Sequence, residues 1–268
     1  MAPESARLKE RLDGLLAGGE MVAPTVEVLE SVDSTNRYLL EMAATAGDGP
    51  QACVAMNQTA GRGRRGRTWH ARPGASLALS LAWPVSRGRV PPSYPVGVGV
   101  GVIQALESLG LEGVRLKWPN DLMLDGAKLG GILVEQRMPG PDRPGWLVAG
   151  IGLNREAADT LGLERAVTDL ASHVPGGAPE WLELAARVIE QQCRLHPVLL
   201  REGIAPLDAE LERIDLLRGQ AIEVLDDGAH ARAVGIDPAS GCLVAVFDDG
   251  AVRHLHSGEV SVRGCEHG

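Results

Sequence analysis

The sequence predicts an α+β protein with a larger domain over residues 1–214 and a small β-barrel domain over residues 215–268. In the first part, helical patterns occur together with strand-like apolar runs. From Leu217 onward, short β-rich runs are separated by turns such as Asp-Asp-Gly, which is typical of a small barrel. The 268 residues, 44% of them hydrophobic, suffice for a large domain and a small one.

The helices of the larger domain are predicted from apolar spacing and capping residues. Residues 5–17 form an amphipathic pattern that ends at Gly18-Gly19. Asp33-Ser-Thr-Asn36 is typical of a capped helix start after a strand. A small-residue helix packed closely on a sheet is expected over 96–109, and two helices, broken near Gly203 and Pro206, over 180–213.

The strands are predicted from alternation and from short buried apolar runs. In the larger domain they are expected at 25–32, 52–56, 76–83, 114–118, 122–124, 129–135 and 146–153. Asp125-Gly126 predicts a tight hairpin turn, and the glycines and Pro73 within residues 58–74 predict a loop. In the small domain, strands are expected at 221–225, 231–236, 242–247, 252–255 and 260–263.

The charge distribution indicates a local anion site. The net charge of −9 argues against a general nucleic-acid binder, which needs a basic surface. Residues 49–106, however, contain seven arginines and no acidic residue. Lysine is scarce: Lys9, Lys117 and Lys128 are the only lysines among 26 basic residues.

The termini and cysteines indicate a soluble, cytoplasmic protein without a membrane segment. The charged N-terminus lacks the apolar core of a signal peptide, and no run of about 18 apolar residues occurs. The four cysteines are far apart and form no CxxC pair, which argues against a zinc or redox motif.

The most distinctive motif is Gln58-Thr-Ala-Gly-Arg-Gly-Arg-Arg-Gly-Arg-Thr-Trp69. It contains GxGxxG, but Pro73-Gly74 prevents the helix that a dinucleotide site needs, and the required acidic residue is missing. Glycines allow a ligand to approach the backbone closely. The guanidinium group of an arginine can donate two hydrogen bonds to the two oxygens of a carboxylate or phosphate. The alternative is a solvated basic loop; the combination favours an anion-binding loop.

Three further motifs place polar residues at strand ends. Leu116-Lys-Trp-Pro-Asn-Asp-Leu122 combines residues that suit a nucleotide with Mg²⁺, although it also suits a plain turn. Lys128 precedes Gly130-Gly131 in an apolar strand, so it either meets an anion or extends to the surface. Gly150-Ile-Gly-Leu-Asn154 either borders a ligand or packs closely in a sheet.

Together these motifs resemble those of biotin protein ligases, in order and in spacing. The resemblance covers about residues 26–263, including Ser257-Gly-Glu-Val-Ser-Val-Arg263 at the end of the barrel. It implies a mixed sheet flanked by helices, related to class II aminoacyl-tRNA synthetases, followed by an SH3-like barrel. It implies that biotin and ATP give biotinyl-5′-AMP and pyrophosphate. A specific lysine of a biotin carboxyl carrier protein then takes the biotin and releases AMP.

The resemblance also implies the roles of the site residues. Lys128, Arg64 and Asp121 are the expected catalytic residues, and Asp121 also the Mg²⁺ ligand. The residues expected to bind biotin are Ser34, Thr35, Asn36, Gln58, Arg62, Gly63, Arg64, Lys128, Gly131 and Gly150. The residues expected to bind ATP are Arg64, Arg67, Trp69, Lys117, Asn120, Asn154 and Arg263.

Some members of this family are also repressors with an N-terminal winged helix-turn-helix. About 30 residues precede the first motif here, so a ligase without DNA binding is expected, and a homodimer is possible. The nearest alternative is a lipoate ligase, which uses the same acyl-adenylate chemistry; the arginine loop and the barrel favour biotin. A nucleic-acid module and a dinucleotide-dependent oxidoreductase are disfavoured by the net charge and by Pro73.

Overall fold

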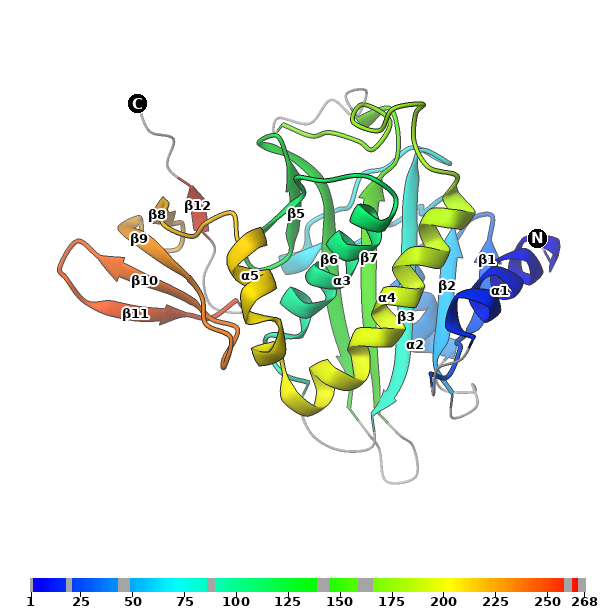
Figure 1. Cartoon of the computed structure of the whole chain (residues 1–268), viewed down its shortest axis with the longest axis horizontal. Coiled ribbons are helices and arrows are strands. Elements are labelled where there is room, and N and C mark those ends of the chain that lie inside the picture. Colours follow the sequence, from blue (N-terminus) through cyan, green and yellow to red (C-terminus); the bar gives the residue numbers. More distant parts are fainter. Residues whose placement is uncertain are drawn as a thin grey trace.

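The computed structural model describes residues 2–17, 21–42, 49–85, 90–138, 145–158, 166–257 and 262–264. Its strands form a seven-stranded sheet and, further along the chain, a five-stranded sheet (Figure 1). The helices cover the larger sheet, so the mixed sheet flanked by helices is confirmed (Figure 1). None of the helices in these ranges is long and apolar enough to cross a membrane.

The larger sheet has the order β1-β2-β3-β7-β6-β5-β4. Its strands are β1 (Thr25–Leu29), β2 (Gln51–Ala55), β3 (Ser76–Val85), β4 (Arg115–Lys117), β5 (Asp121–Leu124), β6 (Ala127–Arg137) and β7 (Gly145–Asn154). β1 and β2 are parallel, and the other neighbours are antiparallel. All seven predicted strands are present, and Asp125 and Gly126 form the predicted turn with φ values of 48° and 77°.

The helices are α1 (Ala2–Leu16), α2 (Thr35–Met42), α3 (Tyr94–Ser108), α4 (Trp181–Glu202) and α5 (Asp208–Ile214), with short 3-10 turns at η1 (Arg64–Gly66) and η3 (Ala205–Leu207). α3 and α4 lie on one face of the sheet and α2 on the other (Figure 1). Strand alternation divides β3 between these faces. Leu79 belongs to the larger core cluster, and Ala82 packs with Leu39 of α2 in the smaller one.

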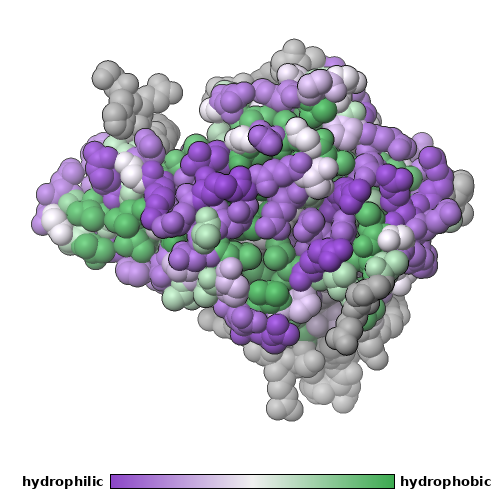
Figure 2. Space-filling model, viewed as in Figure 1, coloured by the Kyte–Doolittle hydropathy of each residue, from purple (hydrophilic) through white to green (hydrophobic). Residues whose placement is uncertain are grey.

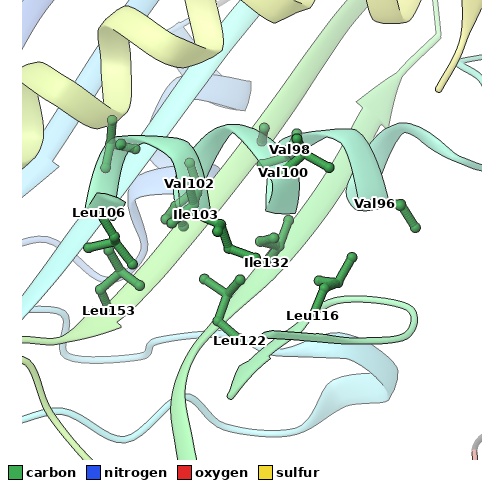
Figure 3. Packing of buried hydrophobic residues seen from close by; sticks show 14 of the residues in the cluster. Val96, Val98, Val100, Val102, Ile103, Leu106, Leu116, Leu122, Ile132 and Leu153 are labelled. Atoms are coloured by element: carbon green, nitrogen blue, oxygen red, sulfur yellow. The ribbon is translucent and has the colours of Figure 1, made fainter. Parts of the chain in front are cut away.

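One side of α3 packs on the sheet, chiefly against β6 and β4 (Figure 3). Val96, Ile103 and Leu106 of the helix gather with Leu122 and Ile132 of the sheet in the larger core cluster. The glycines of α3 refine the prediction of close packing on the sheet. A Cβ at Gly97 would lie 2.3 Å from Leu199 Cδ2, so Gly97 permits close approach to α4 instead. Gly99 faces the sheet, where a Cβ would lie 2.8 Å from Leu116 Cδ1.

The second sheet is antiparallel, with the order β11-β10-β9-β8-β12, and is consistent with the expected SH3-like domain. Its strands are β8 (Ala221–Val224), β9 (Ala229–Ile236), β10 (Leu243–Phe247), β11 (Val252–Leu255) and β12 (Val262–Gly264). Val234, Val246 and Val252 are exposed on three of these strands, and Figure 2 shows hydrophobic surface over this sheet.

Two buried side chains lie where the two sheets meet, and one of them, Trp118, hydrogen-bonds across the junction. Trp118, which follows β4, donates from Nε1 to the Gly241 carbonyl at 3.0 Å. The Asp215 carboxylate, 2% exposed, accepts the backbone N–H groups of Leu217 at 3.0 Å and Ile236 at 3.1 Å. Burial raises the pKa of Asp215 above its usual value. The domain boundary after residue 214 stays a prediction, and it lies next to this junction.

Candidate active site

A cavity of about 330 Å³ gathers most of the residues predicted for the site. They come from α2, the arginine-rich loop, the β4–β5 turn, β6 and β7. The predicted residues that line it are Ser34, Thr35, Asn36, Gln58, Arg62, Gly63, Arg64, Arg67, Trp69, Lys117, Asn120, Asp121, Lys128, Gly131 and Gly150. Segments far apart in the chain therefore meet at one place.

Glycines on β6 and β7 let side chains from other segments pack closely against the strands that line the cavity. A Cβ at Gly150 would lie 2.3 Å from Asn36 Oδ1, and a Cβ at Gly152 would lie 2.7 Å from the Trp69 ring. Gly131 lies next to Gly152 in the β6–β7 register, and all three glycines line the cavity. Because alternate residues of a strand share a face, the spacing of Gly150 and Gly152 lets Asn36 and Trp69 both lie close against one face of β7.

Buried hydrogen bonds connect the polar side chains at one end of the cavity. Thr35 donates its backbone N–H to Gln58 Oε1 at 2.8 Å, and its hydroxyl lies 2.7 Å from that of Ser80. Asn36 donates from Nδ2 to the Leu133 carbonyl at 3.1 Å. Ser34, Thr35 and Asn36 are each less than 5% exposed. Networks of this kind give the participating groups defined orientations.

Lys128 and Asp121 form the charged pair of the site. Lys128 Nζ lies 2.5 Å from Asp121 Oδ1 and 5.9 Å from the centroid of the Trp69 ring. Trp69 Nε1 is buried and has no hydrogen-bond partner among the described residues. The Lys128 side chain is only 12% exposed, so its ammonium is held near the cavity and away from bulk water.

Arg64 is the least exposed arginine of the loop. Its Nη1 donates to Asn120 Oδ1 at 3.1 Å, and its Nη2 donates to the Ser257 carbonyl of the second domain. Burial lowers the pKa of the Arg64 guanidinium from its ordinary value, and the charge of Arg65 adds to this effect. A half-buried cation beside other cations is a favourable place for an anionic ligand.

Two predicted residues are not among the lining residues. Asn154 is 3% exposed and donates from Nδ2 to the carbonyls of Lys128 at 3.3 Å and Thr168 at 2.9 Å. It therefore holds the backbone of Lys128, and a contact with nucleotide stays a prediction. Arg263 pairs with Glu223 through the backbone of β12, but its side chain lies outside the described residues.

Sequence reasoning missed several residues. Gly152 and Trp118 line the cavity, as does Leu225 of the second domain. Ser80 and Glu135 do not line the cavity but hydrogen-bond to Asn36, which does. A signal existed for two of them, because Ser80 interrupts the apolar run of β3 and Gly152 repeats the spacing of Gly150. For Leu225 no local pattern indicates a contact with the other domain.

Comparisons with known proteins agree with this arrangement. A family model described as the biotin/lipoate A/B protein ligase family matches residues 28–152. Over 257 residues the chain is 33% identical to the bifunctional ligase/repressor BirA of Escherichia coli, covering 92% of this chain and 77% of that protein. The chain belongs to the biotin/lipoate protein ligase family. Membership confirms the resemblance stated above and makes the chain a ligase.

Other members of the family show the same similarity. The biotin–[acetyl-CoA-carboxylase] ligase of Mycobacterium tuberculosis is 32% identical over 194 residues, which is 69% of this chain and 67% of that protein. The structure of the biotin protein ligase from Aquifex aeolicus in complex with biotin and ATP matches with a TM-score of 0.75 at 26% identity. This match covers 90% of this chain and 99% of that one, so it includes most of both sheets.

Proposed function

We propose that this ligase activates biotin with ATP and transfers it to a lysine of a biotin carboxyl carrier protein. A carboxylate oxygen of biotin attacks the α-phosphorus of ATP, and the bond to the β-phosphate breaks to release pyrophosphate. The uncharged amine of the carrier lysine then attacks the acyl carbon of biotinyl-5′-AMP, loses a proton, and expels AMP. The observation that carries this proposal is the single cavity that joins a polar end near Thr35 to the Lys128–Asp121 pair.

The first step brings two anions together, and the charges of the cavity suit this. Lys128 is proposed to lie between the biotin carboxylate and the α-phosphate, and Arg64 and Arg67 to contact phosphate oxygens. All three line the cavity. Fixed cations reduce the repulsion between the reactants and stabilise the charge that develops on the α-phosphate.

Mg²⁺ fits the site as a partner of the phosphates. Among the described residues no group of three His, Cys, Asp or Glu side chains could hold a metal ion alone. Asp121 lines the cavity, and Mg²⁺ in proteins is commonly held by one or two carboxylates together with substrate phosphates. The ion would neutralise phosphate charge, and the Asp121 carboxylate would hold it.

The remaining positions follow from the two ends of the cavity. We propose that the biotin ring system lies at the Ser34, Thr35 and Gln58 end, with Gly131 and Gly150 as walls and Asn36, Arg62 and Gly63 around it. The adenine is proposed to stack on Trp69, as bases do on aromatic rings, with Lys117 and Asn120 near the nucleotide. Contacts of Asn154 and Arg263 with ATP belong to the same proposal.

Partners and location are proposed with the reaction. We propose that the ligase is cytoplasmic, acts on a carrier protein, binds no operator DNA and can form a homodimer. The net charge of −9 supports the absence of DNA binding, which needs a basic surface.

Mass spectrometry of an isolated carrier domain tests the complete reaction. After incubation with the ligase, biotin, ATP and Mg²⁺, the domain should gain one biotinyl group. A carrier domain with its acceptor lysine replaced by arginine is the matched control and should gain none. No mass gain on the unaltered domain contradicts the proposal.

A further inference from the structure

Glu135 connects two parts of the site without lining the cavity. Its Oε2 accepts a hydrogen bond from Asn36 Nδ2 at 2.9 Å, and its Oε1 lies 3.1 Å from Arg62 Nη1. The side chain of Glu135 is 21% exposed, and that of Arg62 is 50% exposed. Alternation along β6 places Glu135 on the same face as Gly131 and Leu133, which do line the cavity.

The orientation of the Asn36 amide depends on Glu135. Asn36 Nδ2 donates one proton to the Leu133 carbonyl and the other to Glu135. The reverse orientation would place the amide oxygen against a carbonyl and a carboxylate, which are acceptors only. Asn36 Oδ1 therefore points to the Ser80 hydroxyl, 2.6 Å away.

This orientation determines where the hydroxyl protons go. Ser80 has one hydroxyl proton and donates it to Asn36 Oδ1, so Ser80 Oγ becomes an acceptor for Thr35. The Thr35 hydroxyl has two inward acceptors, Ser80 Oγ at 2.7 Å and Gln58 Oε1 at 3.2 Å. Whichever of these two oxygens accepts the Thr35 hydroxyl proton, Thr35 has no second proton to donate, so its hydroxyl presents lone pairs to a ligand. Gln58 Oε1 is occupied by the Thr35 N–H, which leaves Gln58 Nε2 as the donor.

We propose that Glu135 is a positioning residue that sets the hydrogen-bond polarity of this end of the cavity. Through Asn36 and Ser80 it makes Thr35 an acceptor and leaves Gln58 a donor. Such a pair matches a cyclic urea, which presents an N–H group beside a carbonyl oxygen. A dithiolane ring has neither group and would leave the ligand-facing lone pairs of Thr35 and the Gln58 Nε2 donor without partners, which is costly in a buried site. The inference rests on the proposed function, because it specifies which part of biotin this end recognises.

Two substitutions separate the acceptor of Glu135 from its charge. Glu135→Gln keeps an oxygen that accepts from Asn36 but loses the ion pair with Arg62, whereas Glu135→Ala loses both. In biotin-dependent ATP–pyrophosphate exchange, Glu135→Ala should raise the KM for biotin about 10-fold or more, with a smaller change in the KM for ATP. Glu135→Gln should stay within about 3-fold of wild type for both substrates. Glu112→Ala, at an exposed position outside the site, is the surface control.

Thermal unfolding of each variant separates positioning from loss of fold. The inference predicts that Glu135→Ala unfolds cooperatively and still shows the selective change in the KM for biotin. Equal effects of Glu135→Gln and Glu135→Ala would overturn it, since the ion pair with Arg62 would then be the cause. Equal changes in both KM values would also overturn it. If wild type shows no biotin-dependent exchange, the proposed function fails as well; if it does and Glu135→Ala equals it, only this inference fails.

Discussion

The ammonium of Lys128 lies 2.5 Å from the carboxylate of Asp121, and both side chains line the cavity. The β5–β6 hairpin carries the two residues, and a second segment holds the backbone of Lys128. The backbone N–H of Lys128 donates to the Ala166 carbonyl at 3.0 Å, and the backbone carbonyl of Lys128 accepts the Thr168 N–H at 3.0 Å. The hairpin and the segment around Ala166 and Thr168 therefore hold the pair in place. A fixed position suits groups that stabilise the charge that develops in the transition state.

Substitution of Lys128 tests its role in adenylation. Lys128→Ala should reduce biotin-dependent ATP–pyrophosphate exchange by about 100-fold or more, because one fixed cation at the reacting phosphate is lost. Lys9→Ala is the control, since Lys9 is exposed on α1 and pairs with Asp13. Exchange at the wild-type rate in Lys128→Ala would remove Lys128 from the proposed mechanism.

Substitution of Asp121 tests the proposed Mg²⁺ contact. Asp121→Asn should raise the Mg²⁺ concentration for half-maximal exchange by about 10-fold, because a neutral amide holds the ion less well. The control is Asp125→Asn in the turn of the same hairpin, where asparagine also tolerates the φ of 48°. An unchanged Mg²⁺ dependence in Asp121→Asn would argue against the contact.

A methyl group at Gly152 tests the placement of the adenine. In Gly152→Ala the new Cβ would lie 2.7 Å from Trp69 Cε2, so the ring must move. We expect the KM for ATP to rise about 10-fold, as loss of one stacking contact implies, and Trp69→Ala to show a similar rise. Gly14→Ala, where a Cβ meets nothing within 4 Å, should behave as wild type. A change confined to the KM for biotin would contradict the stacking.

Removal of the indole N–H of Trp118 tests the junction between the sheets. Trp118→Phe leaves the Gly241 carbonyl without its donor and should lower the free energy of unfolding by about 1–3 kcal/mol. Trp181→Phe is the control, since Trp181 is only partly buried. Denaturant unfolding measures both, and equal losses would show that the Nε1–carbonyl hydrogen bond adds nothing.

The partly buried imidazole of His196 makes stability depend on pH. It stacks on Trp83 with centroids 4.2 Å apart, and its Nδ1 lies 2.8 Å from the Tyr94 hydroxyl. Burial lowers the pKa of His196 to about 4. Unfolded histidine has a pKa of about 6.5, so the unfolded state binds the proton first, and stability falls as the pH drops from about 6.5 towards 4.

The loss amounts to roughly 3 kcal/mol across that interval, since each pKa difference of one corresponds to about 1.4 kcal/mol. His196→Gln removes this contribution, so its free energy of unfolding should depend less on pH between about 6.5 and 4. His230→Gln, at an exposed position, should keep the wild-type slope. Parallel slopes for His196→Gln and wild type would contradict the assignment.

The sequence predicted elements well where the pattern is local. The hairpin around Asp125-Gly126 and the strands of both sheets follow from turn residues and alternation, and the structure confirms them. Lysine scarcity also pointed to the site, because Lys117 and Lys128 both line the cavity. Contacts between distant segments could not be predicted in this way. Asn36 and Glu135 are 99 positions apart, and only the fold brings the amide to the carboxylate.

Contacts between distant segments also determine which neighbours Gly97 and Gly99 of α3 face. Their composition indicated close packing, but a single sequence does not show whether a helix glycine faces the sheet or another helix. Asn154 illustrates a related limit, because a polar residue at a strand end suits a ligand contact and a backbone contact equally. The structure gives its amide two backbone carbonyls.

ATP–pyrophosphate exchange measured with biotin and with lipoate tests the central claim most directly. It reports formation of the acyl-adenylate without requiring a carrier protein. The account predicts exchange that depends on biotin and Mg²⁺, with little or none when lipoate replaces biotin. Exchange that depends on lipoate alone would contradict it.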